Sequence, residues 1–180
     1  MPGHGQTWWG FHQLDERWAA LLVEDAALAP GDLVLDVGAG LGALTAPLVE
    51  AGVRVVAFEL HSRRALLLRD RFQAAPVTVV VADARDLRLP RRPYRVVSNP
   101  PFAVTTALIR RLLAAESRLV QADLVVPSHV AARWASPAAP AACRWKQCFE
   151  ASVVRPLPRR AFHPPATQPA VVLRLEARHR

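Results

Sequence analysis

The chain has 180 residues, of which 52% are hydrophobic, and its formal net charge is +8 at pH 7. This length and composition predict one globular domain and exclude a disordered polypeptide. Lys146 is the only lysine among 23 basic residues, so the charge is nearly all arginine. The charge indicates either a nucleic-acid partner or arginine-rich solvated faces.

The first ten residues lack the basic and apolar regions of a signal peptide, and no apolar stretch is long enough to cross a bilayer. We therefore expect a cytoplasmic protein that does not bind membranes. The two cysteines, Cys143 and Cys148, are too few for a disulfide framework or a structural zinc site. We expect no metal and interpret both cysteines as ordinary strand residues.

Residues 1–30 are expected to form an N-terminal segment and an amphipathic helix that ends near Pro30-Gly31. The apolar residues at helical spacing are Leu14, Trp18, Leu21 and Leu22. Residues 33–37 are apolar except for one aspartate, which predicts a strand buried on both faces. A glycine-rich turn and a helix to about Gly52 follow, and Pro47 fits this helix only in its first turn.

The alternation of strand and helix continues along the chain and predicts an α/β fold with a doubly wound, mostly parallel sheet. Further strands are expected at 53–59, 77–82, 94–98 and 119–126, and further helices at 62–73, 105–115 and 129–135. Residues 85–93 and 136–142 are expected to be loops. The last two extended runs, 145–154 and 170–176, have no helix between them. We therefore expect them to form an antiparallel hairpin at one edge of a seven-stranded sheet.

The run Gly38-Ala-Gly40-Leu-Gly42 follows the first of these strands and predicts a nucleotide-binding turn. Glu59 ends the next strand, 21 residues after Gly38, where a carboxylate can accept hydrogen bonds from ribose hydroxyls. Asp83 follows the third strand and could accept a hydrogen bond from an adenine amine. Two alternatives stay open here: a dinucleotide motif that ends at Ala43, and glycines that only make a tight turn.

Asn99-Pro100-Pro101-Phe102 follows the fourth strand, where loops line the ligand crevice of such a sheet. The Asn99 side chain and the Pro100 carbonyl offer two acceptors to an amino group, and Phe102 offers a face on which a base can stack. An adenine amine is a weak nucleophile, so catalysis would consist mainly of positioning and electrostatics. The alternative is a turn in which Phe102 belongs to the core.

Five segments together resemble the ribosomal RNA adenine-N6 methyltransferases, above all the erythromycin-resistance (Erm-type) enzymes, with the small-subunit dimethyladenosine transferases as relatives. The segments are 36–45, Phe58-Glu59-Leu60, Ala82-Asp83-Ala84, Asn99-Pro100-Pro101-Phe102 and 158–165. The resemblance implies a Rossmann-like class I methyltransferase fold with S-adenosylmethionine as cofactor. It also implies methylation of 23S ribosomal RNA near the peptidyl-transferase centre, with resistance to macrolides, lincosamides and streptogramins as the consequence.

The same resemblance implies the site residues. Asn99 and Pro100 would hold the target amine, and Phe102 would stack on the adenine. The residues expected to hold S-adenosylmethionine are His12, Leu14, Gly38, Gly40, Glu59, Leu60, Asp83, Ala84 and Asn99. One departure is that His12 stands where the family has an asparagine, in a stretch that usually reads Gln-Asn-Phe-Leu.

A second departure is expected at the C-terminus: Arg180 follows soon after the last predicted strand, so we expect the chain to lack the family's helical C-terminal domain. We therefore expect a single domain over residues 1–180, a monomer, and a substrate of naked or partly assembled RNA. Arginines are expected to contact RNA phosphates, several of them on the same rim as Asn99. The candidates are Arg88, Arg91, Arg92, Arg110, Arg159 and Arg160. Trp8 and Trp9 either stack on RNA or cofactor, or cover apolar surface.

Three other functions compete with this interpretation. A methyltransferase of DNA adenine or of protein glutamine could use the same Asn-Pro-Pro-Phe loop. A non-catalytic RNA-binding relative could keep the fold. An NAD-dependent dehydrogenase would leave the Asn99 loop unexplained and lacks an evident catalytic His or Lys/Tyr arrangement.

Overall fold

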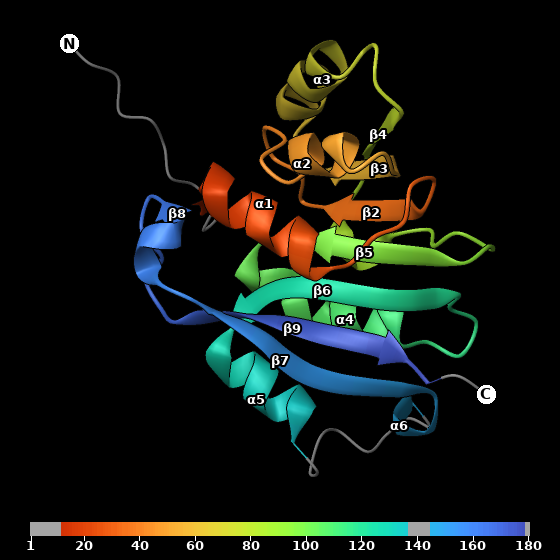
Figure 1. Cartoon of the computed structure of the whole chain (residues 1–180), viewed down its shortest axis with the longest axis vertical. Coiled ribbons are helices and arrows are strands. Elements are labelled where there is room, and N and C mark those ends of the chain that lie inside the picture. Colours follow the sequence, from red (N-terminus) through yellow and green to blue (C-terminus); the bar gives the residue numbers. More distant parts are fainter. Residues whose placement is uncertain (1–11, 137–144, 179–180) are drawn as a thin grey trace.

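A computed structural model describes residues 12–136 and 145–178. Seven strands form one sheet in the order β4-β3-β2-β5-β6-β9-β7, with helices packed on it (Figure 1). The strands are β2 (Leu33–Val37), β3 (Arg54–Glu59), β4 (Val77–Val81), β5 (Tyr94–Ser98), β6 (Leu119–Pro127), β7 (Phe149–Leu157) and β9 (Ala170–Ala177). The strands β2 to β6 are parallel, whereas β9 runs antiparallel to both β6 and β7. The predicted mostly parallel sheet with an antiparallel C-terminal pair is confirmed.

Two apolar cores lie on the two faces of the sheet, and they explain why these segments fold as they do. One core includes buried residues of α1 (Glu16–Asp25), α2 (Thr45–Glu50) and α3 (Ser62–Arg71). The other includes buried residues of α4 (Thr105–Leu112), α5 (Ser128–Ala135) and Trp145 of the short α6 (Trp145–Cys148). All five residues of β2 are buried, as expected for a central strand covered on both faces.

The N-terminal segment is tied to the C-terminal part of the chain by a second, two-stranded sheet. The strand β1 (Gln13–Leu14) pairs antiparallel with β8 (Phe162–His163), and Leu14 faces Phe162 in the register. Both of these side chains are almost completely buried. No local sequence pattern predicted this pairing, which joins segments about 150 residues apart.

Two linked sequence predictions need correction: the start of the strand at residue 145, and Cys148 as a strand residue. Residues 145–148 form the helix α6, so Cys148 is helical. The reason is that Trp145 packs in the core, with its ring centroid 5.6 Å from that of Trp134. The edge strand therefore begins at Phe149 and extends to Leu157. In contrast, Pro47 does lie in the first turn of α2, which begins at Thr45.

Some predictions fall on residues outside the described ranges: Trp8, Trp9, Cys143 and most of the loop 136–142. Within the described ranges, no helix is both long enough and apolar enough to span a bilayer.

Candidate active site

The candidate site lies where the order of the strands reverses. After β2, the chain adds β3 and β4 on one side and later β5 and β6 on the other. The loops that follow the carboxyl ends of β2 and β5 therefore face each other, which is where doubly wound sheets bind ligands. Figure 1 shows the arrowheads of both strands at the same edge of the sheet. We call this the carboxyl edge.

Gly38 makes the two loops fit together. Its φ is +78°, and a Cβ atom added there would lie 3.0 Å from Cδ of Pro101 and 3.5 Å from Cα of Pro100. The Gly38 N–H also donates to the Phe58 carbonyl at 2.8 Å, which fixes the turn against the end of β3. Glycine is therefore required both by the backbone conformation and by the close approach of the Asn99 loop.

Glu59 is held at the end of β3 by backbone donors. Its Oε2 accepts from the Gly40 N–H at 2.9 Å, and its Oε1 accepts from the His61 N–H at 2.8 Å. The residue is only 4% exposed. Two backbone bonds leave further lone pairs on both oxygens, so the carboxylate can still accept from a ligand's hydroxyl groups.

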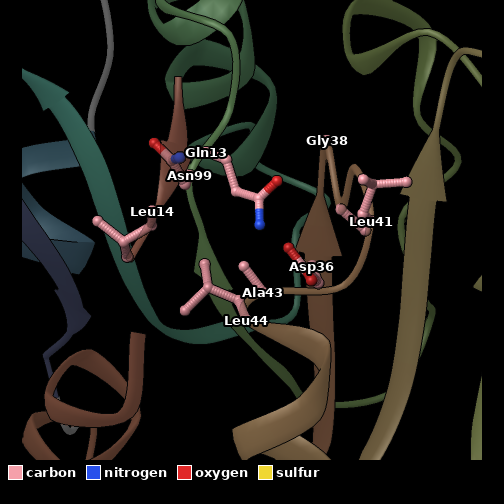
Figure 2. Close-up of a pocket in the computed structure, with 9 residues that line it drawn as sticks. Gln13, Leu14, Asp36, Gly38, Leu41, Ala43, Leu44 and Asn99 are labelled. Carbon is pink, nitrogen blue, oxygen red and sulfur yellow. The ribbon is translucent and has the colours of Figure 1, made fainter. Parts of the chain in front are cut away.

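A pocket of about 290 Å³, including its open mouth, lies between the glycine turn and the N-terminal strand β1. Its lining residues are Gln13, Leu14, Asp36, Gly38, Ala39, Leu41, Ala43, Leu44 and Asn99. Figure 2 shows the Gln13 amide and the Asp36 carboxylate pointing toward each other across this pocket. The pocket thus combines apolar walls with a small number of polar groups, which is typical of small-molecule sites.

Asp36 is the charged group at the floor of the pocket. It is 1% exposed, and its Oδ2 accepts from the Thr45 hydroxyl at 2.7 Å. Burial raises the pKa of Asp36 to about 7, while the Thr45 hydrogen bond lowers the pKa and the nearby negative charge of Glu59 raises it. A carboxylate in such a position is stabilised in its ionised form when a cation enters the pocket.

Asn99 presents one oriented acceptor to the same space. Its Nδ2 donates to the main-chain carbonyl of His12 at 2.8 Å. Because a carbonyl can only accept, this bond fixes the amide with Oδ1 on the opposite side. Among the residues that the structure describes, no donor reaches Asn99 Oδ1 or the Pro100 carbonyl. Both acceptors that the sequence suggested are therefore available to an amino group.

The late motif 158–165 positions His12, and through it Asn99. The His12 Nδ1–H donates to the Pro164 carbonyl at 3.1 Å. The His12 ring also lies between two phenylalanines, with centroid distances of 6.1 Å to Phe102 and 6.4 Å to Phe162. Phe162 is fully buried, whereas Phe102 is partly exposed at the start of the turn η2 (Phe102–Val104). Phe102 is thus partly packed against the core and partly accessible to a ligand.

Asp83 lies at the end of β4, next to Glu59 along the carboxyl edge. It begins the turn η1 (Ala84–Asp86), accepts the Arg85 N–H at 2.9 Å and pairs with the Arg85 guanidinium at 2.6 Å. This hydrogen-bonded pair holds the pKa of Asp83 down at about 2, so the carboxylate is ionised at neutral pH. Leu60, which is 61% exposed, and the partly buried Ala84 follow Glu59 and Asp83 in the chain.

The candidate RNA-binding arginines do not share one rim. Arg159 and Arg160 lie in η3 (Arg159–Ala161), directly before β8, and thus on the side of β1 and Asn99. Arg91 and Arg92 precede β5, so they lie at its amino end, opposite to Asn99. Several of the arginines were expected on the rim of Asn99, and these two do not lie there, because six residues of mostly extended chain lie between Arg92 and Asn99, roughly 20 Å.

Asp36 and Gln13 were not among the residues that the sequence singled out for ligand binding. A signal for Asp36 was present, because it is the only charged residue in an otherwise apolar strand. A buried strand keeps such a residue only when a partner or ligand compensates the charge. Gln13 had no such signal, since its position depends on the pairing of β1 with β8.

The carboxyl edge therefore places three carboxylates, Asp36, Glu59 and Asp83, at the ends of the adjacent strands β2, β3 and β4. A cation can meet the first and ribose hydroxyls the second. An adenine amine can meet the third once it displaces part of the Arg85 pair that occupies both Asp83 oxygens. This set fits an adenosine derivative with a cationic amino-acid tail, as in S-adenosylmethionine.

Comparisons with known proteins agree with this assignment. The model of the family described as ribosomal RNA adenine dimethylase matches residues 11–180. A relative from Corynebacterium diphtheriae, named rRNA adenine N-6-methyltransferase, is 31% identical over 90% of this chain. A ribosomal RNA small subunit methyltransferase A from Phenylobacterium zucineum is 36% identical over 85% of this chain. The chain spans only 64% and 57% of the lengths of these two relatives.

Two solved structures resemble the fold closely. The 23S rRNA methyltransferase ErmE has a TM-score of 0.80 and 27% identity, with 93% of this chain and 70% of that chain covered. A dimethyladenosine transferase from Plasmodium falciparum has a TM-score of 0.79 and 21% identity, with coverages of 93% and 64%. The Rossmann-like methyltransferase fold is thereby confirmed. This chain belongs to the ribosomal RNA adenine dimethylase family, whose members take their methyl group from S-adenosylmethionine.

Proposed function

We propose that this chain transfers a methyl group from S-adenosylmethionine to the N6 amine of an adenine in 23S ribosomal RNA. The observation that carries the proposal is the orientation of Asn99. Its Nδ2 is occupied by the His12 carbonyl, so its Oδ1 is free to accept a hydrogen bond beside the pocket that Asp36 and Gly38 line.

Three carboxylates would hold the cofactor, one for each of its polar parts. Asp36 would accept from the α-ammonium group, Glu59 from the ribose hydroxyls, and Asp83 from the adenine amine. Leu14 lines the pocket, and Leu60 and Ala84 would pack against the adenine ring. Gly38 and Gly40 would supply the backbone turn, and His12 would contribute through its carbonyl. When bound, S-adenosylmethionine supplies a methyl group that its positive sulfur already activates.

The protein's own part in the reaction would be to position the amine. Asn99 Oδ1 and the Pro100 carbonyl would accept its two N–H bonds, which favours a tetrahedral nitrogen with its lone pair directed at the methyl group. Phe102 would hold the adenine ring by stacking once the base has left its helix. No strong general base is needed, because the nitrogen loses its proton only after the bond to carbon has formed.

The choice of 23S RNA rests on the likeness to ErmE and to the rRNA adenine N-6-methyltransferases. Resistance to macrolides, lincosamides and streptogramins would follow in a cell that carries the enzyme. A second candidate substrate is the small-subunit RNA, which is favoured by the 36% identity to a small subunit methyltransferase. DNA adenine and protein glutamine are less favoured alternatives, since the relatives of this chain are named as ribosomal RNA methyltransferases.

The experiment is to incubate the purified chain with S-adenosylmethionine and either 23S or 16S RNA, and then to map modified adenines by primer extension. Expression in a macrolide-sensitive strain is tested in parallel, with the Asn99→Ala variant as the control. The proposal predicts a modified adenine in 23S RNA and a raised macrolide tolerance that the variant lacks. Modification of 16S RNA alone, without raised tolerance, would assign the chain to the small-subunit enzymes.

A further inference from the structure

The segment 83–118 carries exposed arginines that have no ion pair or hydrogen bond among the residues that the structure describes. The segment 83–118 contains eight arginines and only three acidic residues. Three of the arginines, Arg85, Arg95 and Arg111, form ion pairs with nearby carboxylates. In the described part of the chain, the guanidinium groups of the other five form neither an ion pair nor a hydrogen bond, and all five residues are exposed. These five are Arg88, Arg91, Arg92, Arg110 and Arg118.

Contacts between η1, α4 and the starts of two strands bring the segments that carry these arginines together. The Arg111 Nε of α4 donates to the Leu87 carbonyl at 3.1 Å, which places α4 beside the segment that carries Arg88. The Tyr94 N–H donates to the Arg118 carbonyl at 3.3 Å, and Tyr94 is the register partner of Leu119. The amino ends of β5 and β6, with Arg91, Arg92 and Arg118, therefore lie side by side.

This basic surface begins near the site and ends at the opposite edge of the sheet. The helix α4 starts directly after the turn that carries Phe102, and it leads toward the start of β6. In Figure 1 the loop before β5 lies at the end of the strand opposite to its arrowhead. The far arginines are thus roughly 20 Å from Asn99, too far to touch the target adenine itself.

We propose that these five arginines bind the phosphate backbone of the substrate RNA at a distance from the target adenine. The proposal rests on the proposed function, and it adds that the RNA continues from the carboxyl edge across η1 and α4 to the amino edge. Guanidinium groups match phosphate geometry, and unpaired exposed ones can bind phosphate without first breaking a bond within the protein. An acidic protein is the alternative partner, and the test separates it from RNA.

The test compares two triple variants with the same change in net charge. The first is Arg91→Glu, Arg92→Glu and Arg118→Glu. The matched control is Arg17→Glu, Arg69→Glu and Arg133→Glu, three exposed arginines away from the amino ends of β5 and β6. Binding of a fluorescent 23S RNA fragment is measured by anisotropy at several salt concentrations, and methyl transfer is measured separately. Calorimetry with S-adenosylmethionine reports whether each variant keeps an intact cofactor site.

We expect the first variant to weaken RNA binding at least tenfold and to lower the slope of log Kd against log salt by about 2–3. Its kcat and its affinity for S-adenosylmethionine should stay unchanged, and the control should bind RNA within about threefold of wild type. Equal losses in both variants, or none in the first, would overturn the inference and leave an acidic protein as the partner to test. RNA binding through this surface without methyl transfer would instead overturn the proposed function alone.

Discussion

The affinity for S-adenosylmethionine should depend on pH through Asp36. The carboxyl group has its pKa raised to about 7 because it is buried, so in the free protein at neutral pH it is about half protonated. Only the ionised form can neutralise the ammonium group of the cofactor. That ammonium has an ordinary pKa of about 7.7–8.0, and it therefore stays charged at and below pH 7.

The size of the effect follows from the pKa of about 7. If the cofactor binds only ionised Asp36, the apparent Kd is multiplied by one plus the ratio of protonated to ionised carboxyl groups. The Kd should then rise about sixteenfold from pH 7.0 to pH 5.5, and binding at pH 6 should release about 0.9 proton. Calorimetry in two buffers with different heats of ionisation measures both quantities.

Asp36→Asn is the control, because its amide does not titrate. Its Kd should be higher than that of wild type at pH 7 and should vary less than twofold down to pH 5.5. A wild-type Kd that stays constant over this range would refute the reasoning, and so would a variant that keeps the wild-type dependence.

Folding stability should change in the same pH window. Since native Asp36 keeps a proton that the unfolded chain loses near pH 4, its contribution to stability falls as pH rises from about 4 to 7.

Three further predictions concern the backbone, the core and the amide of the site. Gly38→Ala should raise the KM for S-adenosylmethionine and lower kcat, each at least tenfold. The reason is that the alanine Cβ would lie only 3.0 Å from Cδ of Pro101 in the Asn99 loop. Gly31→Ala has a similar positive φ but meets nothing within 4 Å, so unchanged kinetics are expected, and equal effects would disprove the packing argument. Phe162→Ala should lower the free energy of unfolding by about 3–5 kcal/mol in urea titrations, because the ring is fully buried. A loss below about 1 kcal/mol would show that β8 is not part of the core. Asn99→Asp should lower kcat more than a hundredfold, since a carboxylate cannot donate to the His12 carbonyl. His12→Ala keeps that carbonyl but loses the ring contacts that position it, so a clear but smaller loss of kcat is expected.

The fold was predictable because local composition and tertiary structure agree over most of the chain. Residues 33–37 and 94–98 were assigned as strands with the bounds that the structure has, since apolar runs there are bordered by Gly, Pro and polar residues. Residues 145–148 were wrongly predicted to begin a strand. Their composition does not distinguish a strand from a helix, and the packing of Trp145 on Trp134 belongs to tertiary structure.

The candidate site was predictable in its parts but not in its connections. Gly38, Glu59, Asp83 and Asn99 could be found because each follows a strand in a recognisable motif. The link from Asn99 to the late motif 158–165 could not be found from the sequence, because it depends on a two-residue strand pairing across most of the chain. The position of Arg91 and Arg92 at the far edge was not predicted, although the order of the elements implies it. Residues that precede a parallel strand lie at the opposite edge from those that follow it.

The proposed reaction is methyl transfer to the N6 amine of an adenine in ribosomal RNA, with Asn99 holding the amine. The most direct test incubates 23S RNA with S-adenosylmethionine carrying a labelled methyl group, and then identifies labelled nucleosides by mass spectrometry. Wild type should give label on N6 of adenosine, and Asn99→Ala should give at least a hundredfold less, with a far smaller loss of S-adenosylmethionine affinity in calorimetry. Label on any other atom, or equal label from the variant, would contradict the account.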